Sequence, residues 1–355
     1  MLGSVVGRLP EGPLVLVGDV HGELAALEAL LARPELDPTG DGSFGGRTLC
    51  FLGDLVDRGP DSPGVLRLVR GLIDRGRAVS LLGNHELNLL RQERDPKGDN
   101  RWFRGETRRL PGGELLPERR AESDSERSEL LDMLADLPVA LERSDLRLVH
   151  ACWDARAIAA LASWQRHELI ERHEAGLASA EADLHAAGIL GEARAEERDL
   201  DRRFPLGAAD PVPPPASELI ARREVAVQNS EPLRVVTSGR EVPLEPGSSS
   251  FAAGGKWRHT RREPWWRSYA EAQSVVVGHY WRGPSRPGEH RRVGPPDPFH
   301  GEPDFGSLTT VGSGEVHCID YSVGRRFLDR LAGRTTYRGH LAALLWPERE
   351  LVLDH

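Results

Sequence analysis

The chain has 355 residues, a net charge of −9, 39% hydrophobic residues and 28% charged residues, a composition typical of a globular protein. The length permits one domain with insertions or two domains. The negative charge argues against a general nucleic-acid binder, and no stretch has the length and apolarity of a membrane span. Residues 1–10 show no secretory signal, so we expect a cytoplasmic protein. The three cysteines form no CxxC pair and are predicted to be buried thiols.

The first 90 residues alternate between apolar strands and amphipathic helices. Strands are predicted at 14–19, 47–54 and 78–84, with helices at 23–36 and 62–76. The apolar runs are continuous, which is typical of parallel strands covered on both faces. This βαβαβ pattern predicts an α/β fold. Each strand ends in Gly followed by Asp or Asn, at the carboxyl edge where open α/β sheets build their sites.

Two segments further along interrupt this pattern. Residues 95–126 are rich in Arg, Gly, Glu and Pro, and residues 155–270 are polar, with helices predicted over 155–200 and Pro-rich or Gly/Ser-rich loops after them. A helix is predicted at 125–137. We therefore expect a single domain over 1–355 with insertions at about 95–126 and 155–270, the second forming a cap over the site.

The remaining predicted strands surround these segments. Two short strands, VALE and LRLVH, close on His150, and the core resumes with SVVVGHYW, which contains His279. The last strands are predicted in LTTVG, EVHCIDYSVG, HLAALLW and ELVLD.

Polar side chains stand at the ends of these strands. The motifs GDVHG and GDLVDRG, the motif GNHE and the two later strand ends supply six candidate metal ligands: Asp19, His21, Asp54, Asn84, His150 and His279. Side chains at the carboxyl ends of neighbouring parallel strands converge. Carboxylates brought together in this way repel one another unless a cation neutralises them.

The ligand types suit two divalent cations, Mn in the first place and Fe or Zn as alternatives. One cation would take Asp19, His21 and an oxygen of Asp54. The second would take Asp54, Asn84, His150 and His279. A shared carboxylate holds two cations about 3.5–4 Å apart, and a water between them would ionise near neutral pH and attack phosphorus in line.

The motifs GDVHG, GDLVDRG and GNHE, in this order, resemble those of the calcineurin-like metallophosphoesterases. The resemblance is closest to the branch of Ser/Thr phosphoprotein phosphatases and bacterial diadenosine tetraphosphatase-like enzymes, and it is strongest over residues 13–94. It implies an α/β fold of four layers, with two mixed β-sheets flanked by helices and carrying a helical and loop insertion.

The resemblance also implies roles for residues that are not ligands. His85 would protonate the leaving group, with Asp57 positioning its ring. Arg58 would bind the phosphate oxygens through its fork of donors. The second phosphate-binding arginine of the family would come from GGKWRHTRREPWW, as Arg258 or Arg261.

Structural alternatives stand beside these readings. Asp19 and His21 alone could be a helix cap and a polar turn, Asp57 and Arg58 could form only a turn ion pair, and the late histidines could be core residues. The matching positions on three strands favour the site. Glu86 is interpreted as structural because an acidic side chain favours the start of a helix.

Two further groups of residues remain open. The three tryptophans near the second arginine could stack on a base, although such clusters more often fill a core: Trp257, Trp265 and Trp266. His317, within a predicted strand, could support the site from behind the ligands.

The sequence leaves the substrate open among a phosphorylated small molecule, a nucleotide and a phosphoprotein. The C-terminal run CIDYSVG favours dinucleoside polyphosphates, which is our preferred prediction, whereas GNHE favours a Ser/Thr protein phosphatase. Small phosphomonoesters or nucleic-acid ends are less consistent with the negative charge. A catalytically inactive, metal-bound interaction scaffold is the alternative from another class. No membrane partner is expected, and the oligomeric state stays open.

Overall fold

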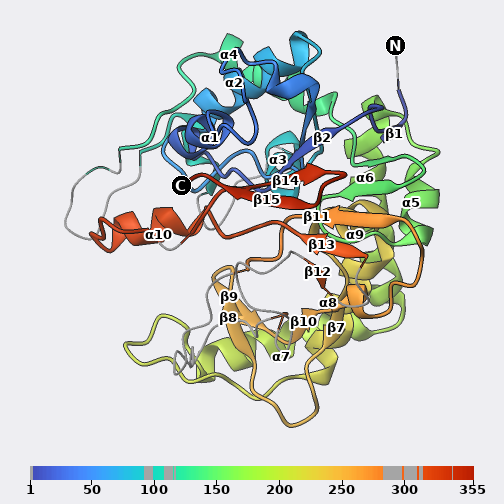
Figure 1. Ribbon diagram of the computed structural model, residues 1–355. Coiled ribbons are helices and arrows are strands. Elements are labelled where there is room, and N and C mark those ends of the chain that lie inside the picture. Colours follow the sequence, from blue (N-terminus) through green and yellow to red (C-terminus); the bar gives the residue numbers. More distant parts are fainter. Residues whose placement is uncertain are drawn as a thin grey trace.

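Two β-sheets lie face to face at the centre of the computed structural model, and helices cover their outer faces (Figure 1). The structure describes residues 3–91, 99–107, 115, 117–282, 298–299, 310–311, 315–337 and 339–355. This arrangement confirms the predicted α/β class with two mixed sheets between helices. No helix among the described residues has the length and apolarity needed to cross a membrane.

The first sheet has five strands in the order β15-β14-β2-β3-β4. Its strands are β2 (Leu14–Val17), β3 (Thr48–Phe51), β4 (Ala78–Ser80), β14 (Ala342–Trp346) and β15 (Glu350–Leu353). The first three run parallel, and β14 pairs antiparallel with both β2 and β15. Helices α1 (Leu24–Leu31) and α2 (Ser62–Asp74) lie in the crossover connections that parallel neighbours require.

The second sheet has six strands in the order β1-β5-β6-β11-β13-β12. Its strands are β1 (Val6–Arg8), β5 (Ala140–Glu142), β6 (Leu146–Val149), β11 (Ser274–Val277), β12 (Thr310–Val311) and β13 (Val316–Cys318). The neighbours β6, β11 and β13 are parallel to one another. Their carboxyl ends therefore meet at one edge of the sheet.

The remaining elements lie on or beyond the sheets. Those outside the segment between β6 and β11 are η1 (Phe44–Gly46), α3 (Asn84–Leu90), η2 (Asp99–Arg104), α4 (Asp124–Ala135) and α10 (Arg325–Leu331). The segment between β6 and β11 contains α5 (Ala155–Leu161), η3 (Arg166–Glu168), α6 (Leu169–Ala186), α7 (Ile189–Arg203), α8 (Glu218–Ser230), α9 (Pro232–Ser238), β7 (Glu241–Pro243), β8 (Phe251–Ala253), β9 (Lys256–Arg258), β10 (Thr260–Arg262) and η4 (Trp265–Arg267). Helix α7 and strands β7 to β10 lie at the bottom of the view, beyond the six-stranded sheet (Figure 1).

The apolar strands bury both of their faces, which explains their continuous hydrophobic runs. In β2, Leu14 and Leu16 face the core between the two sheets, whereas Val15 and Val17 face the core beneath the helices. All four side chains are fully buried. Successive strand residues point to opposite faces, so a sandwich covered by helices selects apolar residues at every position.

Several aromatic residues occupy positions that the sequence left open or did not suggest. The three tryptophans weighed as base-stacking residues are buried in the core: Trp257, Trp265 and Trp266. Trp102 is also fully buried, although it lies in a segment whose composition suggested a surface insertion. The three cysteines are buried and free, as predicted.

His317 lies in β13, away from the metal centre described below. Because this histidine is buried, we expect acid to destabilise the fold. Its ring contacts Trp346 edge-on at 6.2 Å between centroids, and burial lowers the pKa of His317 to about 4. The pKa of an unfolded histidine is about 6.5, so the unfolded chain gains a proton that the native chain excludes as the pH falls below this value. As the pH falls from 7 to 5, His317 should lower the free energy of unfolding by about 2 kcal/mol.

Urea unfolding of the wild type and His317→Leu at the two pH values measures this cost. The variant should lose about 2 kcal/mol less than the wild type between pH 7 and pH 5. The exposed His185 in α6 offers the control His185→Leu, which should follow the wild type. An equal loss in all three proteins would contradict the prediction.

Candidate metal centre

The six predicted ligands come together where strands of both sheets end. Asp19, His21, Asp54 and Asn84 follow β2, β3 and β4 of the first sheet, and His150 and His279 follow β6 and β11 of the second. Contacts cross between the sheets: the backbone N–H of His279 donates to Asp19, at 3.1 and 3.2 Å from its two carboxylate oxygens. His279 Nδ1 lies 2.9 Å from Asn84 Oδ1. The site is therefore built at the seam between the two sheets.

Asp54 lies at the centre of this cluster. Its Oδ1 is 3.3 Å from His150 Nε2, and its Oδ2 is 3.8 Å from His21 Nε2 and 3.9 Å from His85 Nε2. Two sets of side chains have ligand atoms within 4.8 Å of one another, and Asp54 belongs to both: His21, Asp54 and His85, and Asp54, His150 and His279. One carboxylate is thus placed to be shared by two cations.

The tautomers of two histidines favour a cation between them and Asp54. His21 Nδ1 lies 3.1 Å from the carbonyl of Val56, and His150 Nδ1 lies 2.7 Å from the carbonyl of Leu52. An imidazole that donates from Nδ1 to a carbonyl presents a lone pair at Nε2. Among the described residues, His150 Nε2 has no hydrogen-bond partner. Because this nitrogen faces the Asp54 carboxylate at 3.3 Å, without a metal ion it takes up a proton, which raises the pKa of His150 to about 10, and a divalent metal ion would replace that proton.

The charges around the two carboxylates lead to the same conclusion. Burial and the neighbouring carboxylate of Asp320 raise the pKa of Asp19 well above its usual range. Burial also opposes ionisation of Asp54, but His150, His85 and the other nearby imidazole outweigh it and hold the pKa of Asp54 well below its usual range. Asp54 is therefore ionised, while Asp19 needs a nearby cation to share the site as an anion.

The backbone is strained at the site. Among the described residues other than glycine, eight have positive φ, and five of these belong to the predicted site: His21, Asp54, Asp57, Arg58 and His279. Such conformations cost of order 1–3 kcal/mol each and concentrate at functional sites. These five backbone conformations therefore lower the free energy of unfolding, and they direct the side chains into the site.

Two glycines next to the ligands are required by close approach. A Cβ atom at Gly278 would lie 2.0 Å from Asp19 Oδ1, and one at Gly83 would lie 2.3 Å from Asp54 Oδ1. The Gly-His and Gly-Asn pairs in the motifs therefore leave room for the carboxylates of the neighbouring strands.

The predicted acid and phosphate-binding residues lie beside the cluster. His85 Nδ1 is 2.6 Å from Asp57 Oδ2. Burial opposes protonation of His85, but Asp54 and Asp57 outweigh it and raise the pKa of His85. The guanidinium of Arg58 lies 2.9 Å from His85 Nε2 and 2.6 Å from His21 Nε2. One guanidinium thus contacts both imidazoles of the first candidate ligand set.

The arginines of the later segment pair with carboxylates, and Arg262 shares Glu241 with Arg258, at 3.0 Å from its Oε1. Arg258 Nη2 lies 2.7 Å from Glu241, and Arg261 Nη2 lies 3.2 Å from Glu245. The neighbouring Arg262 acts on the cluster: after burial, its charge is the next cause that lowers the pKa of His279. Arg258 and Arg261 are the predicted phosphate-binding arginines, and Arg262 is a further arginine close enough to influence His279.

Two further residues at the site were also missed. Asp320 follows β13 and is buried beside Asp19, whose pKa it raises. Trp281 is half-buried, and its ring centre lies 4.7 Å from the guanidinium carbon of Arg58. Its closeness to His279 in the sequence was a signal that could have identified it. Trp281, unlike the buried tryptophans of the later segment, is therefore a partly exposed aromatic residue beside the cluster.

Glu86 supports the site through the backbone. Its carboxylate accepts hydrogen bonds from the N–H groups of Asp54 at 2.8 Å, Leu55 at 2.8 Å, Val56 at 3.3 Å and Gly83 at 2.9 Å. Glu86 is fully buried. Its position at the start of α3 was interpreted as structural; the structure adds that its carboxylate fixes the loop that carries Asp54.

Replacing Glu86 with glutamine should destabilise the protein by about 3 kcal/mol, because an amide N–H₂ would face backbone donors that now bond a carboxylate. Urea unfolding measures this loss. Activity should fall as well, since the Asp54 loop loses its support. Glu129→Gln, at an exposed position of α4, should change stability by less than about 0.5 kcal/mol. Equal effects of the two substitutions would refute this role of Glu86.

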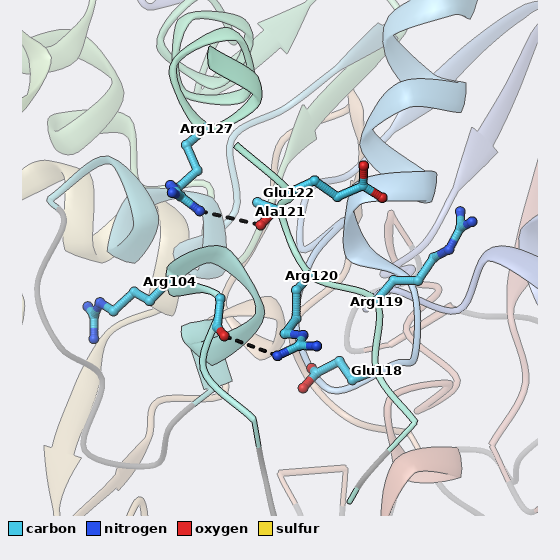
Figure 2. A pocket seen from close by; sticks show the side chains of 8 residues that line it. Arg104, Glu118, Arg119, Arg120, Ala121, Glu122 and Arg127 are labelled. Carbon is cyan, nitrogen blue, oxygen red and sulfur yellow. Dashed lines mark hydrogen bonds between the residues drawn. The ribbon is translucent and has the colours of Figure 1, made fainter. Parts of the chain in front are cut away.

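A separate cavity of about 560 Å³ lies near this region. It is lined by Arg104, Gly105, Glu118, Arg119, Arg120, Ala121, Glu122 and Arg127. Figure 2 shows the side chains of Arg104 and Arg119 extending in opposite directions, while Arg120 donates to the carbonyl of Gly105 at 3.2 Å. The guanidinium groups do not converge on one point, so this cavity lacks the geometry of a phosphate site.

The comparisons with known proteins agree with the motifs. Residues 12–150 match the family model described as calcineurin-like phosphoesterase. The symmetrical bis(5'-nucleosyl)-tetraphosphatase of Edwardsiella ictaluri is 40% identical over 138 residues, which are 39% of this chain and 42% of that protein. The protein of the same name from Pectobacterium carotovorum is 55% identical over 76 residues, 21% of this chain and 24% of that protein. The chain thus matches less than half the length of these curated relatives.

A solved structure of a protein provisionally named a diadenosine tetraphosphatase has a TM-score of 0.43 and 18% identity, covering 99% of this chain and 97% of that chain. The resemblance seen in the three motifs is confirmed by the match of residues 12–150 to the calcineurin-like phosphoesterase family model.

Proposed function

We propose that this protein hydrolyses phosphate esters or anhydrides at a centre of two divalent metal ions. The observation that carries the proposal is the position of Asp54, whose two carboxylate oxygens face three imidazoles and which belongs to both candidate ligand sets. We assign Asp19 and His21 as the other ligands of one cation, with His85 kept as the acid, and Asn84, His150 and His279 as the other ligands of the second. Mn²⁺ is the preferred cation, and Fe or Zn fit the same ligands.

When bound, the two cations supply a polarised phosphate and an ionised water. The chain supplies the rest of the chemistry. Arg58, half-buried and in contact with His21 and His85, binds phosphate oxygens. His85, whose Nδ1 is engaged by Asp57, presents Nε2 to the leaving group and gives it a proton. Arg262 is the arginine from the later segment that we propose as the second phosphate ligand, in place of Arg258 and Arg261.

We propose a dinucleoside polyphosphate as the substrate class. The similarity to proteins named symmetrical bis(5'-nucleosyl)-tetraphosphatases supports this choice. Trp281 adds an aromatic face next to Arg58, suited to a nucleoside. The Glu of GNHE was the residue that favoured a protein phosphatase. Glu86 accepts four backbone hydrogen bonds, so a structural role explains its presence in the motif. It therefore does not favour a phosphoprotein over a nucleotide as the substrate.

The test compares two substrates with the Mn-loaded protein. Diadenosine tetraphosphate is followed by chromatography of the products, and a phosphothreonine peptide by phosphate release. We expect a kcat/KM for the dinucleotide at least about 100-fold above that for the peptide, a difference of about 2.7 kcal/mol in transition-state binding. A preference for the peptide would replace this substrate with phosphoprotein. Two bound metal ions without hydrolysis of either substrate, or of p-nitrophenyl phosphate, would favour the interaction scaffold.

A further inference from the structure

Asp57 is held by two donors on opposite sides of its carboxylate. Oδ2 lies 2.6 Å from His85 Nδ1, and Oδ1 accepts the indole N–H of Trp102 at 2.6 Å. The exposed fractions of these three side chains are small: 1% for Asp57, 3% for His85 and 0% for Trp102. In such a buried setting, a carboxylate bonded at both oxygens has a single rotational position.

Further contacts fix the backbone of Asp57, whose carbonyl accepts the N–H of Gly59 at 2.7 Å. The N–H of Asp57 donates to the hydroxyl of Ser62 at 2.9 Å, and the φ of Asp57 is 71°. Ser62 therefore sets the path of the chain, but it does not set the rotation of the carboxylate. The indole of Trp102 is the neutral partner that does so, and it leaves Oδ2 directed at the histidine.

Trp102 is itself anchored by its own segment. Its carbonyl accepts the N–H of Ala121 at 3.0 Å and that of Gly105 at 3.3 Å. The adjacent Phe103 packs against it edge-on, with 5.7 Å between ring centroids. This segment lies outside the three motifs and delivers one indole donor beneath the His85–Asp57 pair.

We propose that Trp102 is a positioning residue for proton transfer to the leaving group. It fixes the Asp57 carboxylate, which fixes the ring of His85 with Nε2 toward the substrate. The inference rests on the proposed function and adds a member to its acid machinery. Without the indole N–H the carboxylate can rotate, and the cost falls on substrates whose leaving group needs a proton.

The variant Trp102→Phe removes the donor and retains an aromatic ring. With Mn-loaded protein, kcat for an alkyl phosphate, a poor leaving group, should fall about 10- to 100-fold, and kcat for p-nitrophenyl phosphate less than about 3-fold. Trp266→Phe is the matched control, because that buried indole N–H has no hydrogen-bond partner among the described residues. The control should lower both rates equally, if at all. An equal loss for both substrates in Trp102→Phe would overturn the proposal.

A double variant separates positioning from general structural support. If Trp102 acts through His85, then Trp102→Phe should change the rate less than about 2-fold when His85 is already Asn. Additive losses would overturn the proposal. Should Trp102→Phe fail to fold, the indole N–H resonance of Trp102 in the wild type can be compared with that in Asp57→Asn. The resonance should move, and no movement would refute the contact. A wild type inactive on every phosphoester would instead defeat the proposed function.

Discussion

Asp54→Asn should abolish hydrolysis, with kcat/KM reduced by a factor of about 10³ or more, and should weaken both metal ions together. The reason is geometric: the two oxygens of Asp54 face His150 on one side and His21 and His85 on the other. An amide presents one oxygen and one N–H₂ group, so it cannot bridge two cations. Losing several kcal/mol of charge stabilisation accounts for a factor of this size.

Metal content by mass spectrometry and hydrolysis of p-nitrophenyl phosphate measure the two effects. Asp124→Asn is the matched control, since this side chain on α4 is 98% exposed. It should retain two metal ions and full activity. An Asp54→Asn protein that keeps both ions with unchanged affinity would show that Asp54 does not bridge them.

His85→Asn should retain both metal ions and lower kcat for poor leaving groups by about 10²- to 10⁴-fold, the usual contribution of a general acid. Good leaving groups need little protonation and should be affected much less. The structure makes this a sharp test, because His85 also lies within ligand distance of His21 and Asp54. It could therefore act as a ligand or as an acid.

Metal stoichiometry decides between these two roles. If His85→Asn binds one ion where the wild type binds two, His85 is a ligand and our assignment of the acid is wrong. A variant at another buried histidine, His173→Asn, provides the control. His173 pairs with Glu231 at 2.9 Å in the segment between β6 and β11, and its loss should change neither the stoichiometry nor the dependence on the leaving group.

The part of the site that could be predicted from the sequence is the part fixed by the sheets. Asp19, Asp54 and Asn84 follow parallel strands, and parallel strands bring their carboxyl ends together whatever the loops do. The same rule applies to Asp320, which follows β13, a parallel neighbour of β11. The signal was present in EVHCID, and the residue could have been found.

The rest of the site depends on contacts between residues that show no periodic pattern in the sequence. Trp102 reaches Asp57 across 45 positions from an irregular segment whose composition indicates a surface. Arg258 ends β9, and Arg261 and Arg262 are consecutive in β10, so only the placement of these strands decides which arginine acts on His279. The role of the tryptophans could not be predicted for a related reason. A cluster of aromatic residues in the sequence is compatible both with a core and with stacking on a base.

The pairing of β6 with β11 has a consequence for how such enzymes diverge. The two strands are direct neighbours in register, with Val276 opposite Leu148, and they bring the rings of His150 and His279 to 5.3 Å between centroids. The chain between β6 and β11 leaves the sheet after β6 and returns to it at the position next to β6. The last ligand is therefore placed by the backbone ladder, independently of the length of the intervening chain. An exchange of the intervening residues would therefore leave His150 and His279 side by side.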